Sequence, residues 1–255
     1  MSGPRLNSPL GINPSPLSFL KDRMEPTFDK DTRELNYAAK CTTFVIIDVP
    51  ATNTAPRRRY FGTGFFISPK ILLTAGHNTL GHQGPLKTVK ITSPGLLHVS
   101  YSLLQNQRLA TIECTVVGTL YTGKHSDSFL TDIAILHSGT YTAGDYLNLS
   151  PHSTSPGTHV NVMGYPGPAK QEWLAIHEGL RDAEASRLVT DQMFPPQRLT
   201  ITSGTVEALE GNISYRVSTM PGMSGGPVLC NGSAIGPSLS PFKLTSRSPR
   251  RPTDR

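Results

Sequence analysis

The chain contains 255 residues and carries a formal net charge of +6, with 23 Gly and 22 Pro. This length allows one two-lobed domain or two small domains, and no stretch reaches the roughly 18 to 20 apolar residues that a membrane span needs. Arginine clusters at residues 57–59 and 247–255 lack interleaved aromatic residues, so we interpret them as a solvated loop and tail rather than as a nucleic-acid site. Short apolar runs separated by Gly, Pro, Asn and Ser favour an all-β architecture.

Residues 1–38 contain Pro, Ser, Lys and Asp without a sustained periodicity. We predict a flexible extension with one helical turn at residues 33–39. The first 20 residues lack the apolar run that a signal peptide needs. We therefore expect a cytoplasmic protein if Met1 is the true start, and a secreted one if the true start lies elsewhere.

Six strands are predicted in the first half of the chain. The apolar runs that indicate them lie at residues 43–49, 60–68, 71–73, 88–91, 109–118 and 133–136. We expect these six strands to form one small closed sheet. Gly62 and Gly64 within the second run suggest a bulge or a close approach between backbones. The polar, turn-rich residues 138–157 are predicted to connect this lobe to the next.

A second set of strands is predicted at residues 159–163, 199–202, 204–209, 213–218, 227–230 and 233–235. Asn-Gly at 231–232 separates the last two runs and is a strong hairpin signal. Residues 170–193 have a helical composition and are predicted to form a helical insertion. Beyond residue 236 two prolines remove backbone donors that a strand would need, and residues 237–255 are expected to form a disordered basic tail.

The sequence Gly-Met-Ser-Gly-Gly-Pro at residues 222–227 suggests a chemical role. Ser224 is flanked by Gly222, Gly225 and Gly226, which lack a Cβ and let the backbone turn sharply with its N–H groups aimed at one point. Acyl transfer needs a hydroxyl nucleophile of this kind together with amide donors for the oxyanion. A glycine-rich turn between two strands would have the same pattern, so this stretch alone leaves both interpretations open.

A serine nucleophile needs a base that takes its proton and a carboxylate that orients the base. His77 follows the apolar run at residues 71–73, behind the small residues Thr-Ala-Gly. Asp132 precedes the apolar run Ile-Ala-Ile-Leu, where an unpaired charge would be costly. Asp127 is the rival carboxylate. A structural histidine and a strand-capping aspartate are the alternative interpretations of these two positions.

The order of the three residues distinguishes between classes of serine hydrolase. The α/β-hydrolases also carry Gly-x-Ser-x-Gly, but their acid and histidine follow the serine, whereas the last histidine here, His177, precedes Ser224. Subtilisin-like enzymes place Asp before His, and Asp48 does precede His77, but the chain lacks alternating helices. The order His77, Asp132, Ser224 is that of the chymotrypsin-like proteases.

Five short sequence blocks resemble motifs of known proteases. Three are similar to the signature motifs of chymotrypsin-like serine proteases: Thr-Ala-Gly-His at 74–77, Asp-Ile-Ala at 132–134 and Gly-Met-Ser-Gly-Gly-Pro at 222–227. Two more are similar to the glutamyl-endopeptidase-like branch of that family: Gly-Tyr-Pro-Gly at 164–167 and Ser-Gly-Thr-Val at 203–206. The similarity covers roughly residues 40–236.

The resemblance implies an all-β fold of two six-stranded antiparallel barrels, at about residues 39–140 and 155–236, with the second barrel incomplete at its C-terminal end. It implies a polypeptide substrate, hydrolysed without a metal or an organic cofactor. We expect a monomer with no nucleic-acid partner and no membrane partner. Cys41, Cys114 and Cys230 are far apart and odd in number, and neither a disulfide framework nor a zinc site can be read from them.

By the same resemblance, His77 acts as general base and then as general acid, and Asp132 orients it. Ser224 forms the acyl-enzyme, and the amides of Gly222 and Ser224 form the oxyanion hole. Thr219 matches a threonine of the substrate pocket. The pocket histidine of the glutamyl branch has no counterpart, so no preference for glutamate is expected.

The sequence departs from the family at two places. Met223 stands where the trypsin-type branch has an aspartate that pairs with a freed N-terminus, so we expect no activation by such a cleavage. After Gly236, a proline-containing segment replaces the strand that walls the specificity pocket in the family. The final strand and helix of the second barrel are therefore expected to be missing or replaced.

A serine endopeptidase is the function that the sequence predicts. The alternative is a catalytically silent double-barrel protein that binds peptides, or a truncated inactive product with an exposed sheet edge. A basic nucleic-acid-binding protein is a third interpretation, which rests on charge alone.

Overall fold

A computed structural model describes residues 32–100, 109–121, 132–150, 154–167, 192, 194–208, 214–217 and 219–238. Within these ranges, none of the helices combines the length and the apolar character that crossing a membrane requires. The predicted helical insertion at 170–193, the rival carboxylate Asp127 and the predicted tail beyond residue 238 lie outside the described residues, except for residue 192.

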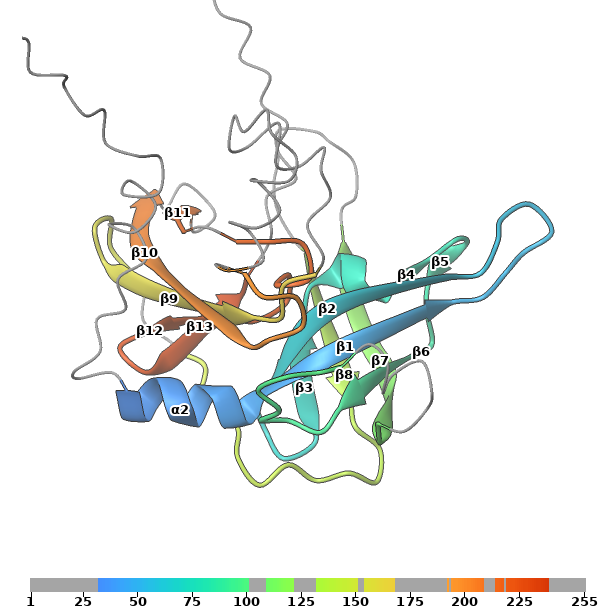
Figure 1. The fold of residues 1–255 in the computed structure, drawn as a ribbon, viewed down its shortest axis with the longest axis horizontal. Helices are drawn as coiled ribbons and strands as arrows, with labels where there is room; N and C mark the ends of the chain where they lie inside the picture. Colours follow the sequence, from blue (N-terminus) through green and yellow to red (C-terminus); the bar gives the residue numbers. More distant parts are fainter. Residues whose placement is uncertain are drawn as a thin grey trace, which may run out of the picture.

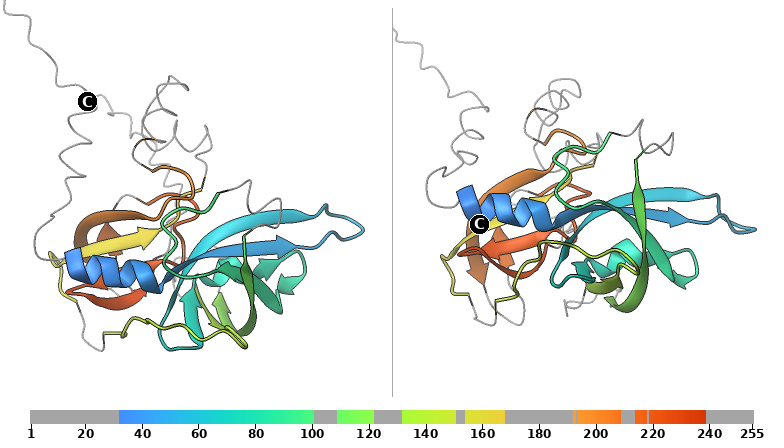
Figure 2. Two further views of the ribbon diagram at one scale, coloured as in Figure 1. Left: turned by 60° about the horizontal axis from the view of Figure 1, so that its bottom comes forward. Right: turned by 90° about the horizontal axis from the view of Figure 1, so that it is seen from below.

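The described chain begins with helix α2 (Thr32–Cys41), which is longer than the single turn predicted at residues 33–39. Ala38 and Cys41 on one side of the helix are fully buried, in a cluster that also contains Phe65 of the first half and Leu229 of the second. The helix lies beside the sheet of the second half in the views of Figures 1 and 2, and its cluster includes Met163 and Ala234 of that half. It is therefore part of the packed structure and joins the two halves.

The first half of the chain forms a closed barrel of six antiparallel strands in the order β1-β2-β3-β8-β7-β6. These strands are β1 (Thr42–Val49), β2 (Arg58–Phe66), β3 (Ile71–Thr74), β6 (Thr88–Thr92), β7 (Thr111–Tyr121) and β8 (Asp132–His137). Alternating side chains of the strands, such as Val45, Ile47, Leu72 and Leu136, fill its core. The prediction of one small closed sheet from six apolar runs is confirmed.

The barrel carries two smaller elements between β3 and β6. A 3-10 helix, η1 (Gly76–Thr79), follows β3 directly, and a short hairpin of β4 (Leu80–Gly81) and β5 (Gly84–Pro85) comes next. The β1–β2 hairpin extends far beyond the barrel (Figure 1). The helix η1 contains His77, the predicted general base.

The second half forms a five-stranded sheet in the order β11-β10-β9-β12-β13, which is open in the part of the chain described. Its strands are β9 (His159–Gly164), β10 (Thr200–Ala208), β11 (Ser214–Arg216), β12 (Pro227–Cys230) and β13 (Ser233–Pro237). The two strands predicted at 199–202 and 204–209 are one continuous strand, since β10 pairs with β9 through Ser203 and Gly204. The structure thus contains one closed barrel and an additional sheet.

Strand β13 continues beyond the point where the sequence suggested that it would stop. The predicted hairpin at 231–232 joins β12 to β13, and Pro227 pairs with Pro237 at the far end of the ladder. Proline lacks an N–H but retains its carbonyl, so it is tolerated at the end of an edge strand. The chain therefore stays beside β12 up to Ser238, whose amide donates to the carbonyl of Gly226 at 2.6 Å.

The two halves pack against each other through aromatic side chains as well as through α2. Phe44 of β1 makes an edge-to-face contact with Tyr165, which follows β9, with ring centroids 5.4 Å apart. Tyr165 is fully buried, and its hydroxyl donates to the carbonyl of Leu96 at 2.6 Å. The residues Gly-Tyr-Pro-Gly at 164–167 thus lie at the junction of the two halves.

Candidate active site

His77 lies at the start of η1, directly after the buried strand β3. The residue before it has to be glycine: a Cβ on Gly76 would stand 2.9 Å from the carbonyl oxygen of Leu120 and 3.1 Å from Oδ1 of Asp132. The missing side chain lets the backbone at His77 approach the start of β8. Steric exclusion of a side chain therefore explains the glycine in the block Thr-Ala-Gly-His.

Asp132, the first residue of β8, forms two contacts with His77. Its Oδ2 lies 2.6 Å from Nδ1 of the imidazole, and its Oδ1 accepts the backbone N–H of His77 at 2.8 Å. A carboxylate held from two directions has one orientation, and an ionised carboxylate can only accept. In a neutral imidazole this contact favours the tautomer with its proton on Nδ1, in which Nε2 carries the lone pair.

Ser224 lies in the tight turn Met223–Gly226, in which the amide of Gly226 donates to the carbonyl of Met223 at 3.1 Å, and a second tight turn, Met220–Met223, directly precedes it. The amide of Met223 donates to the carbonyl of Met220 at 3.0 Å, and Gly222, the third residue of this turn, has φ +96. Pro221 at the second position fixes a negative φ, so the turn is of type II, which demands a positive φ at the next residue. Only glycine meets this demand easily, because its lack of a Cβ removes the steric penalty.

The same turn presents a backbone donor. In a type II turn the N–H of the third residue is not used by the turn's own hydrogen bond. Within the described residues, the amide of Gly222 donates no hydrogen bond, while its carbonyl accepts Oγ1 of Thr63 at 2.7 Å. A Cβ on Gly222 would stand 2.6 Å from the carbonyl oxygen of Tyr165. The carbonyl of Pro221 accepts the N–H of Gly167 at 2.6 Å, so the N–H of Gly222, in the same trans peptide, points away from that contact.

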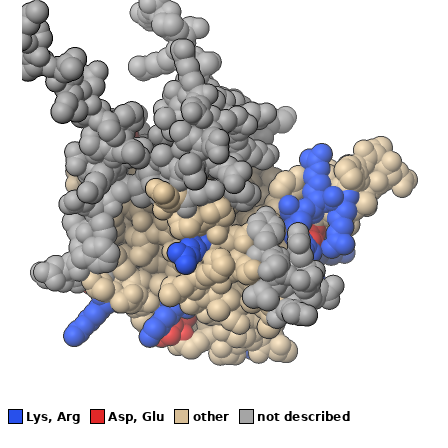
Figure 3. Space-filling model, in the orientation of Figure 1, with Lys and Arg blue, Asp and Glu red and all other residues tan. Residues whose placement is uncertain are grey.

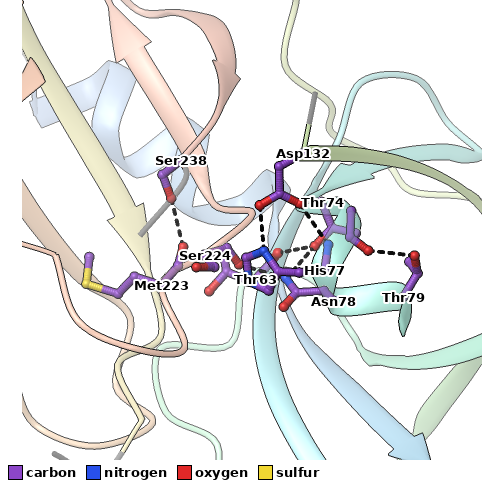
Figure 4. Close-up of polar contacts among 10 residues, drawn as sticks. Thr63, Thr74, His77, Asn78, Thr79, Asp132, Met223, Ser224 and Ser238 are labelled. Atoms are coloured by element: carbon purple, nitrogen blue, oxygen red, sulfur yellow. Dashed lines mark hydrogen bonds and ion pairs between the residues drawn. The ribbon is translucent and has the colours of Figure 1, made fainter. Parts of the chain in front are cut away.

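Hydrogen bonds from the first barrel hold the carbonyl of Ser224. The backbone N–H of Thr63 and the side-chain amide of Asn78 each donate to it at 2.9 Å. Asn78 is the residue after His77, so Ser224 is bonded directly to the element that carries the histidine (Figure 4). The structure brings His77, Asp132 and the turn that carries Ser224 together at one place.

Met223 occupies the position where the trypsin-type branch has an aspartate. Its side chain is fully buried in an apolar cluster with Val160, Val162 and Phe194. A charged residue would be costly in these surroundings. Packing, rather than an ion pair with a freed N-terminus, therefore holds the turn in place.

Ser238 anchors the turn Met223–Gly226, which contains Ser224, a contact that the sequence did not suggest. Its hydroxyl donates to the carbonyl of Met223 at 2.8 Å, and its carbonyl accepts the N–H of Gly225 at 2.7 Å. Because N–H and C=O point in opposite directions across a trans peptide, fixing the Met223 carbonyl also fixes the direction of the Ser224 N–H. Ser238 falls in the segment that the sequence assigned to a tail.

Thr219 immediately precedes the turn and is half-buried. It makes no hydrogen bond within the described ranges, so the structure leaves its assignment to a substrate pocket as a prediction. Thr63, Asn78 and Ser238 are the residues of the site that sequence reasoning missed. Two signals in the sequence could have found the first two of these. Asn78 directly follows His77, and Thr63 lies between Gly62 and Gly64, two glycines that were expected to allow a close approach between backbones.

A metal site or a reactive thiol would use the other ionisable residues in the described part of the chain. In the described segments, no group of three or more His, Cys, Asp and Glu side chains is arranged to hold a metal ion. Cys41, Cys114 and Cys230 are buried free thiols. Burial raises the pKa of the Cys41 and Cys114 thiols to about 12, so neither is ionised at neutral pH.

Basic side chains gather near the loop end of the β1–β2 hairpin, around Asp48 (Figure 3). Nε of Arg59 lies 2.6 Å from Oδ1 of Asp48, and Arg57 lies 3.5 Å from the same oxygen. The hydrogen bond from Arg59 lowers the pKa of Asp48. One of the two arginine clusters noted in the sequence is therefore partly neutralised by an aspartate of the neighbouring strand.

Comparison with known proteins identifies the family. The model of the trypsin-like peptidase domain matches residues 62–236, more than half of the chain. The chain belongs to the trypsin-like peptidase family. The match contains His77, Asp132 and Ser224, and it ends one residue before the last residue of β13. A search of curated proteins by sequence found no match for this trypsin-like peptidase.

Solved structures share the fold of this trypsin-like peptidase. It is similar to the active form of the Rv3671c protease from M. tuberculosis, with a TM-score of 0.51 and 17% identity over 93% of this chain and 82% of that one. It is also similar to an inactive form of the same protein from M. tuberculosis H37Rv, a serine-to-alanine mutant, with a TM-score of 0.50 and 17% identity over 84% of each chain. At this identity the similarity concerns the fold.

Proposed function

We propose that this trypsin-like peptidase is a serine endopeptidase in which His77, Asp132 and Ser224 form a catalytic triad. The observation that carries the proposal is the 2.6 Å contact between Nδ1 of His77 and Oδ2 of Asp132, beside the turn that carries Ser224. Membership of the family supports peptidase chemistry. The type II turn Met220–Met223, directly before Ser224, supports a role for Ser224 beyond that of a glycine-rich connection.

The geometry gives each residue a role. With Nδ1 donating to Asp132, Nε2 of His77 can accept the proton of the Ser224 hydroxyl as its oxygen bonds to the substrate carbonyl carbon. The carbonyl π electrons move to oxygen, where the N–H groups of Gly222 and Ser224 would stabilise the charge. One such donor is worth about 3 kcal/mol of barrier.

The remaining steps return the site to its starting state. The C–N bond breaks and the leaving amine takes the proton from Nε2 of His77, which leaves an acyl-enzyme on Ser224. Water then attacks the acyl carbon and gives its proton to Nε2. The C–O bond to Ser224 breaks and the hydroxyl recovers that proton. These steps need only the residues named and a polypeptide substrate.

Within the family we place the chain in the glutamyl-endopeptidase-like branch. The motifs at 164–167 and 203–206 support this, because both lie in the described second half, the first at the junction of the halves and the second within β10. The buried Met223 also supports it, since the turn needs no ion pair with a new N-terminus. We assign Thr219 to the substrate pocket without a preference for glutamate.

The alternative function is that of a catalytically silent protein that binds peptides. The amide of Gly222 and the apolar surroundings of the turn would serve binding as well as catalysis. The two functions differ in one property, which is the nucleophilicity of Ser224.

A fluorophosphonate probe tests this property directly. The Ser224 oxygen would displace fluoride from phosphorus, and the probe would stay bound to the protein. We expect labelling of the wild type and none of Ser224→Ala, with Ser203→Ala, a serine of β10, labelled like the wild type. A folded wild-type protein that is not labelled, or labelling that survives in Ser224→Ala, would refute the endopeptidase proposal.

A further inference from the structure

Asn78 lies at the centre of a buried polar network that connects the histidine element to the nucleophile turn (Figure 4). Its side chain is 4% exposed, and its Nδ2 donates to the carbonyl of Ser224 and to Oγ1 of Thr74, both at 2.9 Å. Its backbone N–H donates to the carbonyl of Ala75 at 3.0 Å, so η1 fixes its main chain. Both the backbone and the side-chain amide of Asn78 are thus held.

The chemistry of the network determines which way the amide points. Oγ1 of Thr74 donates its proton to the carbonyl of Thr63 at 2.6 Å, so toward Asn78 it can only accept. The carbonyl of Ser224 is also an acceptor. Two acceptors require the NH₂ end of the amide, which has two protons to give. Among neutral side chains of this size, asparagine alone supplies both donors.

Steric contacts prevent the amide from moving aside. A Cβ on Gly62 would overlap the Asn78 side chain, with Cγ 2.6 Å away. A Cβ on Gly225 would overlap the carbonyl of Thr63 and Oγ1 of Thr74. Glycine on both sides therefore lets the two backbones close around the network. Ser224 and His77 cannot separate without breaking the bond from Asn78.

We propose that Asn78 is a positioning residue that holds Ser224 in register with His77. The inference rests on the proposed function, since it assigns a role in the same acyl-transfer site. His77 and Asn78 are consecutive in η1, so one rigid turn carries both the base and the donor that bonds to the nucleophile's own carbonyl. A shift of about 1 Å between reacting groups is enough to cost roughly a hundredfold in rate.

The test compares labelling by a fluorophosphonate in the wild type and in Asn78→Leu, which keeps the branched shape and removes both donors. We expect the maximal labelling rate to fall roughly tenfold to a hundredfold, with unchanged half-saturation, because the probe still binds while Ser224 is misplaced. The shape of the pH profile should stay that of the wild type, since His77 and Asp132 are untouched. Thr43→Val is the matched control, because Oγ1 of Thr43 also donates to a backbone carbonyl inside the barrel, at 2.7 Å, away from the site.

A second variant gives the same readout if Asn78→Leu does not fold. Gly62→Ala keeps Asn78 and displaces its side chain, so it should slow labelling in a similar way. In an Asn78→Ala background, the same Gly62→Ala change should lower the labelling rate little further. An unlabelled wild type would mean that the proposed function is wrong. A labelled wild type together with both variants labelled at the wild-type maximal rate, or variants that only reduce the amount of protein labelled, would overturn the role of Asn78.

Discussion

The two halves of the molecule hold their parts of the site by different means. His77 and Asp132 both belong to the closed barrel, where β3 and β8 are neighbours and Thr74 pairs with Ala134. Ser224 lies on a turn before β12, in a sheet that is open in the described part of the chain. The proposed acid–base pair is therefore internal to one barrel, whereas the position of the proposed nucleophile depends on contacts between the halves.

This difference separates chemical effects from structural ones. The start of β8 is held by pairing of Asp132 with Tyr121 of β7 and, from Ala134 onward, by pairing with β3, so a substitution at Asp132 should affect chemistry alone. The nucleophile turn is supported by Thr63, Asn78 and Ser238, which reach it from other segments. Substitutions there should change stability and rate together. The predictions below test this contrast, beginning with the largest expected effect.

Asp132→Asn should reduce the labelling rate on the order of 10⁴-fold, because an amide in place of the carboxylate favours the wrong tautomer of the histidine. The free energy of unfolding should change little, since the remaining oxygen can still accept the N–H of His77. Fluorophosphonate kinetics and urea denaturation measure the two quantities. Asp48→Asn is the control and should keep the wild-type rate. A fall of less than tenfold would mean that Asp132 does not orient the base.

Gly225→Ala should lower the free energy of unfolding by about 3 kcal/mol, from strain at a positive φ together with overpacking against the first barrel. Gly225 has φ +89, and a Cβ there would overlap Thr63 and Thr74. Gly118→Ala in β7 is the matched control, because a Cβ there meets nothing within 4 Å. Urea denaturation measures both. Equal midpoints for the two variants would contradict the close contact between the halves.

Ser238→Ala should moderately lower both the free energy of unfolding and the labelling rate. It removes the 2.8 Å hydrogen bond to the Met223 carbonyl, for which the described residues then supply one donor, the N–H of Gly226 at 3.1 Å. We expect a loss of about 1 kcal/mol in stability and a fall of roughly tenfold in the maximal labelling rate, because the Ser224 N–H is less well aimed. Unchanged kinetics in a destabilised variant would restrict Ser238 to a structural role.

Asp48 gives the smallest expected effect, far from the site. Arg59 lowers its pKa in the folded state, so the pair stabilises the fold above the unfolded pKa of an aspartate and loses this contribution as the pH falls through the lowered value. The pair is near the surface, and its contribution should be below about 1 kcal/mol. Between pH 7 and pH 2, the melting temperature of Asp48→Asn should therefore fall slightly less than that of the wild type. An identical dependence would show that the pair contributes nothing.

Much of the fold follows from local sequence patterns. Each strand of the barrel has its own apolar run, and the Asn-Gly hairpin at 231–232 falls where it was predicted. The continuous β10 was divided in the prediction because Ser203 and Gly204 resemble a turn, and pairing with β9 overrides that preference. The helix α2 extends beyond its prediction because tertiary contacts at Ala38 and Cys41 stabilise it.

The candidate site was only partly predictable. The residues His77, Asp132 and Ser224 lie in recognisable sequence blocks with a defined order, because the chemistry of acyl transfer requires these residue types. Asn78 acts on Ser224 across 146 positions in sequence, and no local pattern encodes such a contact. Ser238 was assigned to a tail because Pro237 reads as a strand breaker, although an edge strand can end on a proline.

The central claim is that Ser224 is a nucleophile activated by His77. Mapping the fluorophosphonate adduct by mass spectrometry tests this claim most directly. We predict one adduct per folded molecule, on Ser224, and its disappearance on the same timescale in His77→Ala while that variant stays folded. An adduct on any other residue, or equal modification of Ser224 in His77→Ala, would contradict the account.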